Sequence, residues 1–187
     1  MRETDCDVLI IGAGPTGVTL ALIAASHGAS VTICDREAGI FPLPRAAHVD
    51  HEVMRIYQSV GAADAIAAST RTSNRYDFLN KAGDVLLRFD RADQVGPGGW
   101  PAANMIHQPS LERFLRDRLP DNETINLNQE WCFLDQSDLD HGVTAKFDTP
   151  DGPRTLTASF LVGADGARSS VRESAGIELH DLKFDEP

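Results

Sequence analysis

The sequence predicts an α/β fold organised around a parallel sheet, and three observations support this prediction. A short, mostly apolar run, Asp7–Ile11, leads directly into the pattern Gly-x-Gly-x-x-Gly at Gly12–Gly17. An alanine- and leucine-rich stretch follows, and after it a second apolar run that ends at Asp35. A third run, Phe160–Ala164, is apolar throughout, which is typical of a strand buried on both faces of a parallel sheet.

The first elements form a strand–helix–strand unit. We expect a strand near Cys6–Ile11, a helix near Pro15–His27 and a strand near Ser30–Asp35. Gly28 fits the C-terminal stop of the helix. Glycines between strand and helix, with an acid at the end of the second strand, predict a Rossmann-like site for a dinucleotide.

Each glycine of this motif has a mechanical role. Gly12 lets the chain turn tightly, Gly14 lets the backbone approach a pyrophosphate, and Gly17 lets the helix pack closely on the strand. The helix N-terminus then offers unpaired N–H groups and the positive end of its dipole to the phosphates. Asp35 is placed to accept hydrogen bonds from a ribose diol.

The segment after the second strand combines a loop with two helices. Glu37–Arg45 is interpreted as a loop because it contains a glycine and two prolines. Asp50 is expected to cap a helix that runs to about Ser59, and a short alanine-rich helix is expected near Ala62–Ala68. The apolar stripe of the first helix consists of Val53, Ile56, Tyr57 and Val60.

A β-hairpin then interrupts the alternation of strands and helices. Arg75–Leu79 and Val85–Phe89 flank a glycine-containing turn and form its two strands. Val95–Pro101 follows as a flexible, exposed loop, and then come a short strand near Asn104–His107 and a helix near Pro109–Leu119. The hairpin indicates an excursion into a second, sheet-based region.

The C-terminal part is mostly β-structure. Asp165 and Gly166 follow the apolar strand, and a helix is expected over Ser169–Ser174. Thr149–Gly152 is expected to form a hairpin turn. The other strands are expected near Thr124–Leu127, Trp131–Asp135, Val143–Asp148 and Thr155–Ala158.

Composition and charge argue against several classes of function. The net charge is −11 and lysine and arginine do not cluster, which argues against a nucleic-acid partner. No apolar run approaches the length of a membrane span, and the N-terminus enters the first strand at once, so we expect neither a membrane anchor nor a signal peptide. Three widely spaced cysteines indicate reduced thiols and a cytoplasmic protein. His48 and His51 lack further ligands, so no metal site is expected.

The segment Gly163–Arg172 is the second distinctive motif of the chain. With it, the sequence resembles the class A flavoprotein aromatic hydroxylases, which share the para-hydroxybenzoate hydroxylase fold, and most of all the 3-(3-hydroxyphenyl)propionate hydroxylase group. This resemblance implies an α/β, Rossmann-like FAD-binding domain with an inserted β-hairpin. The matching segments are Gly12–Gly17, Pro44–Ala46, Gln58–Gly61, Gly99–Pro101, Gln108-Pro109, Gly163–Arg172 and Phe184–Pro187.

The resemblance assigns roles around the adenosine and pyrophosphate of FAD. Asp35 would hold the ribose, where the family usually has the longer glutamate. Arg36 would flank the adenosine or lie solvated on the surface. Arg45 would reach the pyrophosphate, the alternative being a surface loop arginine. The pyrophosphate itself would lie on Gly12, Gly14, Pro15, Thr16 and Gly17.

Other assignments concern the ribityl part of FAD. Gln108 would hydrogen-bond the ribityl or pyrophosphate region, or else act as a polar helix cap. Asp165 would bind the ribityl hydroxyls, and Gly166 would permit close approach of the backbone. Arg168 and Arg172 would hold this segment, meet the nicotinamide cofactor or form surface ion pairs. No residue is assigned a catalytic role.

The resemblance also implies a reaction, in which NADH or NADPH reduces FAD and the flavin uses O2 to hydroxylate a phenolic small molecule. The family's chains are longer, and their second flavin motif, Gly-Asp-Ala, does not occur here. We therefore predict an incomplete fold. Residues 1–74 and 102–178 would form the FAD-binding domain, 75–101 the hairpin excursion toward a substrate domain, and 179–187 the start of a missing substrate-domain sheet.

Three explanations compete for the short chain: a fragment or truncated gene product, one half of a split enzyme, or a small stand-alone module. Under the first two, activity requires a C-terminal half in the same chain or a second chain. The competing function is a non-catalytic dinucleotide-binding module. A nicotinamide-dependent dehydrogenase is disfavoured by the hairpin and by Asp165-Gly166.

Overall fold

The structure is a computed structural model that describes residues 4–43, 45–90, 94–119 and 123–183. The chain divides into two compact units, which we call unit 1 (Met1–Gly39 and Leu119–Pro187) and unit 2 (Ile40–Arg118). The domain boundaries predicted at residues 74, 102 and 178 stay a prediction. Phe184–Pro187, expected to begin a further sheet, and Pro44 lie outside the described residues.

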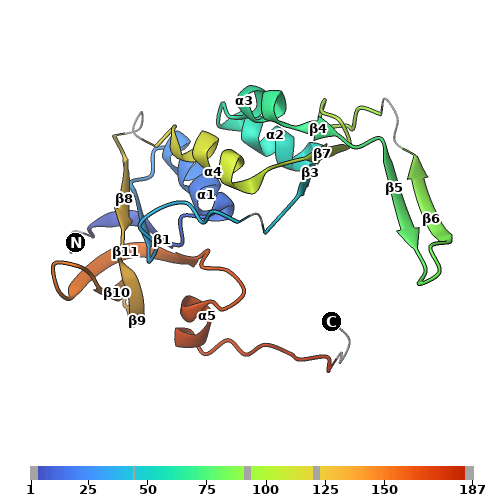
Figure 1. The fold of residues 1–187 in the computed structure, drawn as a ribbon. Helices are drawn as coiled ribbons and strands as arrows, with labels where there is room; N and C mark the ends of the chain where they lie inside the picture. Colours follow the sequence, from blue (N-terminus) through green and yellow to red (C-terminus); the bar gives the residue numbers. More distant parts are fainter. Residues whose placement is uncertain (1–3, 44, 91–93, 120–122, 184–187) are drawn as a thin grey trace. The chain divides into compact units, whose positions relative to one another are not determined.

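Unit 1 is built on a mixed six-stranded sheet with the strand order β8-β2-β1-β11-β10-β9 (Figure 1). The strands β8, β2, β1 and β11 run parallel, and β10 and β9 extend the sheet in antiparallel fashion. The elements are β1 (Cys6–Ile11), α1 (Pro15–Ser26), β2 (Val31–Asp35), β8 (Ile125–Gln129), β9 (Cys132–Leu139), β10 (Gly142–Asp148), β11 (Arg154–Gly163) and α5 (Ser170–Ser174). The predicted α/β class with a parallel sheet is confirmed.

The predicted strand–helix–strand unit forms with nearly the predicted bounds. The helix α1 ends at Ser26, and the backbone N–H groups of Gly28 and Ala29 close its last turn by donating to the carbonyls of Ala25 (2.9 Å) and Ala24 (3.2 Å). The chain then returns to the sheet as β2, which pairs with β1 from Val8↔Val31 to Ile11↔Cys34.

The strand β11 differs from the prediction in two ways. The strands expected at Thr155–Ala158 and Phe160–Ala164 are one continuous strand, because β1 pairs with β11 on both sides of Ser159. The prediction that Phe160–Ala164 is buried on both faces is wrong, since Phe160 is 68% exposed. Phe160 pairs with Val8 of β1, and α1 packs mainly on β2, β1 and β8 rather than on β11.

The core of unit 1 lies against the sheet and is partly aromatic. The ring of Phe147, fully buried, contacts the rings of Trp131 (centroids 5.4 Å apart) and Phe133 (6.1 Å). Trp131 thus packs on the core. The buried members of the cluster are Cys6, Leu9, Ile11, Cys34, Phe133, Val143, Ala145, Phe147, Ala158 and Val171.

Unit 2 combines three helices with short strands. A three-stranded sheet has the order β3-β7-β4, and β5 and β6 form a separate hairpin. The elements are β3 (His48–Asp50), α2 (His51–Ser59), α3 (Ala63–Ser69), β4 (Arg71–Thr72), β5 (Arg75–Leu79), β6 (Val85–Asp90), β7 (Ala103–Met105) and α4 (Gln108–Arg116). Among the described residues, no helix is long and apolar enough to cross a membrane.

The helix α2 begins as predicted and buries part of the predicted stripe. The carboxylate of Asp50 accepts hydrogen bonds from the backbone N–H groups of Glu52 (3.0 Å) and Val53 (2.9 Å), which confirms the N-cap. Met54 and Tyr57 are its buried residues. Tyr57 belongs to the predicted apolar stripe, whereas Ile56, assigned to the same stripe, is 40% exposed.

The predicted hairpin forms between β5 and β6, with one polar and one apolar face. On the polar face, hydrogen bonds from Arg75 and Arg88 hold the pKa of Asp77 well below its usual range. On the other face, the ring of Phe78 contacts the rings of Tyr76 (5.2 Å) and Phe89 (6.2 Å). All three aromatic rings are at least 40% exposed in the described structure.

The loop after the hairpin is exposed at Val95, Pro97 and Gly99, as predicted, and it also makes defined contacts. Val95 and Pro101 form a β-bridge, and the indole N–H of Trp100 donates to Oε1 of Gln58 on α2 (3.0 Å). The ring of His51 lies under the loop, where a Cβ on Gly96 would approach its Cδ2 to 2.1 Å. Nδ1 of this ring is buried and has no hydrogen-bond partner among the described residues.

Gly96→Ala is therefore expected to displace the loop. The added methyl overlaps the imidazole, and overpacking of this kind costs about 1–3 kcal/mol. The emission of Trp100, measured in a Trp131→Phe background that leaves it as the single tryptophan, should shift toward the solvent-exposed spectrum. Adding His51→Ala removes the ring and should reverse the shift. An unchanged spectrum in the single variant would contradict the packing of the loop on His51.

Candidate functional site

Three adjacent parallel strands of unit 1 end side by side at one edge of the sheet. Ile11, the last residue of β1, pairs with Cys34 of β2 on one side and with Gly163 of β11 on the other. The next residue, Gly12, donates its N–H to the carbonyl of Cys34 (2.8 Å), and Ala164 donates to the carbonyl of Ile11 (2.7 Å). The glycine motif therefore lies between the residues that follow β2 and β11, at the edge where open α/β sheets bind their ligands.

The first and third glycines of the motif have no room for a side chain. Gly12 has a φ of +106°, and a Cβ there would lie 2.5 Å from the carbonyl oxygen of Ala164. A Cβ on Gly17 would lie 1.9 Å from the carbonyl oxygen of Gly12. The predicted tight turn and the predicted close packing of helix on strand are both present.

The second glycine faces open space. A Cβ on Gly14 would have no heavy atom within 4 Å. Gly14 is also the N-cap of α1 and supplies no side-chain acceptor, and Pro15 begins the helix. Thr16, in the first turn, is exposed. An uncapped 12-residue helix whose start lies behind an open glycine has the geometry that accepts a phosphate group.

Asp35 lies at the end of β2, on one side of the glycine motif. Its carboxylate accepts hydrogen bonds from the backbone N–H groups of Ala13 (2.5 Å) and Glu37 (2.8 Å). Two carboxylate oxygens offer about four acceptor positions, so Asp35 can also accept from a ribose. The neighbouring Arg36, whose side chain is 66% exposed, forms an ion pair with Glu37 (3.4 Å). Its proposed contact with adenosine stays a prediction.

Asp165 follows β11 on the other side of the glycine motif, and residues at the start of α5 donate hydrogen bonds to it. Its carboxylate accepts from the hydroxyl of Ser169 (2.6 Å) and from the backbone N–H groups of Ser170 (2.7 Å) and Val171 (3.3 Å). Gly166, at a φ of +85°, turns the chain immediately after it, and a Cβ there would meet nothing within 4 Å. The carboxylate is thereby fixed beside the glycine motif.

Arg172 steadies the same segment, whereas Arg168 is exposed. A guanidinium nitrogen of Arg172 donates to the carbonyl oxygen of Ala167 (3.1 Å), and another pairs with Glu173 (2.8 Å). The structure thus shows two of the roles considered for this arginine, namely support of the segment and a surface ion pair.

Unit 2 brings Arg45 and Gln108 together. Oε1 of Gln108 accepts from the backbone N–H groups of Arg45 (2.9 Å) and Ala46 (2.7 Å). Nε2 of Gln108 donates to Oε1 of Glu112 (2.8 Å). The guanidinium of Arg45 lies 4.9 Å from the centre of the Phe41 ring, and no carboxylate of the described residues forms an ion pair with it.

The sequence analysis missed two of these residues. Glu112 is 3% exposed, and its position four residues after Gln108 on a helix is the signal that could have revealed the pair. Phe41 lies four residues before Arg45, but in a loop this spacing has no structural meaning. Cys34, near the ribose position, is a packing residue: it is fully buried, and burial raises the pKa of its thiol to about 12.

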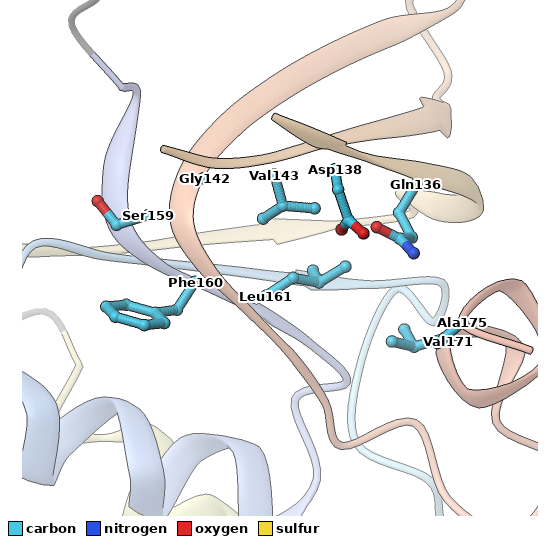
Figure 2. Close-up of a pocket in the computed structure, with 9 residues that line it drawn as sticks. All are labelled: Gln136, Asp138, Gly142, Val143, Ser159, Phe160, Leu161, Val171 and Ala175. Atoms are coloured by element: carbon cyan, nitrogen blue, oxygen red, sulfur yellow. The ribbon is translucent and has the colours of Figure 1, made fainter. Parts of the chain in front are cut away.

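A cavity of about 300 Å³ lies elsewhere in unit 1, between β9, β10, β11 and α5. Figure 2 shows side chains from separate elements around it, including Val143, Leu161 and Val171, with Asp138 and Gln136 at one side. None of the residues Gly12–Gly17, Asp35 and Asp165 lines it. The cavity is therefore separate from the row of strand ends described above.

Comparisons with known proteins agree on one family. Residues 5–184 match the FAD-binding domain family. The chain is 36% identical over 180 residues to a probable NADH-specific resorcinol 4-hydroxylase of Rhodococcus jostii, covering 95% of this chain and 34% of the relative. It is 32% identical over 176 residues to a 3-(3-hydroxy-phenyl)propionate/3-hydroxycinnamic acid hydroxylase of Mycolicibacterium smegmatis. This match covers 92% of this chain and 30% of the relative.

Solved structures show the same fold. The flavin-dependent monooxygenase PieE, solved in complex with FAD and substrate, superimposes with a TM-score of 0.79 at 28% identity, covering 95% of this chain and 33% of that protein. The chain spans about a third of the length of the curated relatives that it matches. Those relatives include 3-(3-hydroxyphenyl)propionate hydroxylases and other flavin-dependent aromatic hydroxylases, as the sequence analysis predicted.

Proposed function

The chain belongs to the FAD-binding domain family, and we propose that it holds FAD along the ends of β2, β1 and β11, as the FAD-binding part of a monooxygenase that hydroxylates a phenolic compound. The observation that carries the proposal is the arrangement of groups at the adjacent ends of β2, β1 and β11. An open glycine turn and an uncapped helix lie between two acidic side chains, and all of them are fixed by the register of three neighbouring strands. An extended dinucleotide requires this combination of an anion-binding helix N-terminus and carboxylates that accept hydrogen bonds from hydroxyl groups.

Each residue then has a defined task. Gly14 and the start of α1, with Pro15 and Thr16, would hold the pyrophosphate, and Arg45 is the side chain proposed to donate charge-assisted hydrogen bonds to it. Asp35 accepts from the ribose hydroxyls, and Asp165 from the ribityl hydroxyls. The turn at Gly166 leaves room for the cofactor next to the backbone.

The bound FAD supplies the redox chemistry, accepting reducing equivalents from NADH or NADPH and using O2 for hydroxylation. Two of the matching relatives are named for resorcinol and for 3-(3-hydroxy-phenyl)propionate, which are both phenols, and this supports a phenolic substrate. Free cysteines at residues 6, 34 and 132 fit a cytoplasmic location. We propose that turnover also uses a C-terminal half or a second chain.

A second candidate is a binding module without turnover. It is favoured by the site itself, because the residues assigned there hold the cofactor and none is assigned a catalytic role. Oxidation of NADH or NADPH by the FAD-loaded chain, with and without simple phenols, separates the two. Phenol-stimulated oxidation with hydroxylated product supports the enzyme, and tight FAD binding without oxidation, even when the C-terminal part of a matching hydroxylase is added, supports the module.

We expect the 187-residue chain to bind one FAD, and Arg45→Ala to weaken binding. Loss of a charge-assisted hydrogen bond costs about 1.5–3 kcal/mol, so the dissociation constant should rise on the order of tenfold to a hundredfold. Quenching of flavin fluorescence during titration measures it. Arg113→Ala removes the same charge from an exposed position of unit 2 and serves as the matched control. Absence of saturable FAD binding by the wild-type chain would refute the proposed function.

A further inference from the structure

Gln108 is the residue whose contacts in the structure depart most from its expected role. The resemblance assigned it to the ribityl or pyrophosphate region of FAD. In the structure it is 6% exposed, and its amide group is engaged by three protein groups. We propose that Gln108 is a positioning residue that acts on the cofactor through Arg45, and that Glu112 sets the orientation of its amide.

The hydrogen-bond inventory of the amide supports this assignment. A carboxamide oxygen has two lone pairs, and both are used by the N–H groups of Arg45 (2.9 Å) and Ala46 (2.7 Å). One of the two N–H bonds of Nε2 is used by Glu112 (2.8 Å). The oxygen therefore has no acceptor position left for a flavin hydroxyl, and a direct contact with FAD could come only from the second N–H of Nε2. The main chain that carries the Arg45 guanidinium, by contrast, is held at two consecutive residues.

Glu112 determines which end of the amide faces the loop. A carboxylate can only accept hydrogen bonds at neutral pH, so it selects the NH2 end of Gln108. The oxygen must then point toward Arg45 and Ala46. Because both side chains are buried, at 6% and 3% exposure, water cannot readily replace either partner.

Arg45 is thus held at both ends. Its backbone is tied to α4 through Gln108, and its guanidinium lies over the Phe41 ring at 4.9 Å. A long, flexible arginine binds an anion more tightly when its backbone is already fixed, because less conformational entropy is lost on binding. The gain from Gln108 should therefore be realised only when the Arg45 side chain is present.

The inference rests on the proposed function and is tested by a double-mutant cycle of FAD binding in the full chain. Gln108→Ala should raise the dissociation constant about tenfold in the wild-type background and less than about twofold in an Arg45→Ala background. Equal losses in both backgrounds would overturn the inference, because they would mean that Gln108 acts independently of Arg45, by a direct contact with FAD or through a general loss of structure.

The orientation by Glu112 is tested with a conservative pair. In Glu112→Gln the new amide oxygen can still accept from Nε2 of Gln108, so FAD affinity should remain within about twofold of wild type. Gln108→Glu places a second carboxylate at the 2.8 Å contact and should weaken FAD binding at least as much as Gln108→Ala. Equal behaviour of Glu112→Gln and Gln108→Glu would contradict the orienting role.

Hydrogen exchange tests the inference without FAD and separates its failure from that of the proposed function. Gln108→Ala should accelerate amide exchange at Arg45 and Ala46. The amides of Ser110 and Leu111, bonded to the carbonyl of His107, should keep their protection and report that α4 is intact. Unchanged exchange at Arg45 and Ala46 would overturn the inference, even if the wild-type chain binds FAD.

Discussion

Gly17→Ala is expected to abolish FAD binding and to lower the thermal unfolding midpoint by on the order of 10 °C. The new Cβ would lie 1.9 Å from the carbonyl oxygen of Gly12, which is backbone in the middle of the motif and cannot rotate away. Overpacking costs about 1–3 kcal/mol and more when the backbone must move, and each kcal/mol corresponds to roughly 2–4 °C at this chain length. The helix propensity gained by replacing glycine with alanine, about 1 kcal/mol, does not offset this.

Gly14→Ala is the matched variant. Its Cβ meets nothing within 4 Å and its φ of −74° suits any residue, so the unfolding midpoint should stay within about 2 °C of wild type. The same methyl occupies the space over the start of α1 where the pyrophosphate is proposed to lie. FAD affinity should therefore fall at least about tenfold without loss of stability.

Thermal unfolding followed by circular dichroism and FAD titration together check the pair, with Gly39→Ala as a neutral control because it too has an open Cβ position. Two outcomes would contradict the assignment. One is a stable Gly17→Ala protein that binds FAD normally, and the other is a Gly14→Ala protein with unchanged affinity.

Asp165→Ala is expected to destabilise the chain even without FAD. The change removes the acceptor of the Ser169 hydroxyl and of the Ser170 and Val171 backbone N–H groups, which lie at the start of α5. Removal of a helix-capping carboxylate costs about 0.5–2 kcal/mol, and the lost charge at the positive end of the helix adds to this. FAD affinity should also fall, because the segment that follows β11 loses its support beside the glycine motif.

Asp165→Asn separates the two effects. Asparagine keeps one oxygen for the N–H groups of Ser170 and Val171, so about half of the stability should return. Urea unfolding of the chain without cofactor measures the first effect, and flavin fluorescence the second. A wild-type unfolding curve for Asp165→Ala would show that the carboxylate does not hold α5.

The local elements were predictable because each has a signal within a few residues. The acceptors for the N–H groups at the start of α2 come from Asp50, which immediately precedes the helix. The turn between β5 and β6 and the end of α1 likewise depend on neighbouring residues. Burial was less predictable, since Ile56 and Phe160 are exposed although both belong to apolar patterns. Whether an apolar face is covered depends on which element packs on it.

The sequence by itself determined the glycine motif, the acids at the ends of two strands and the family to which the chain belongs. It could do so because these signals are residue types at fixed spacings. Only the tertiary structure decided what the polar side chains bind, because those contacts join residues far apart in the chain. Asp35 accepts from Ala13, 22 residues away, and Gln108 accepts from Arg45, 63 residues away. Strand register and helix packing bring these pairs together, and they make Gln108 a support for Arg45.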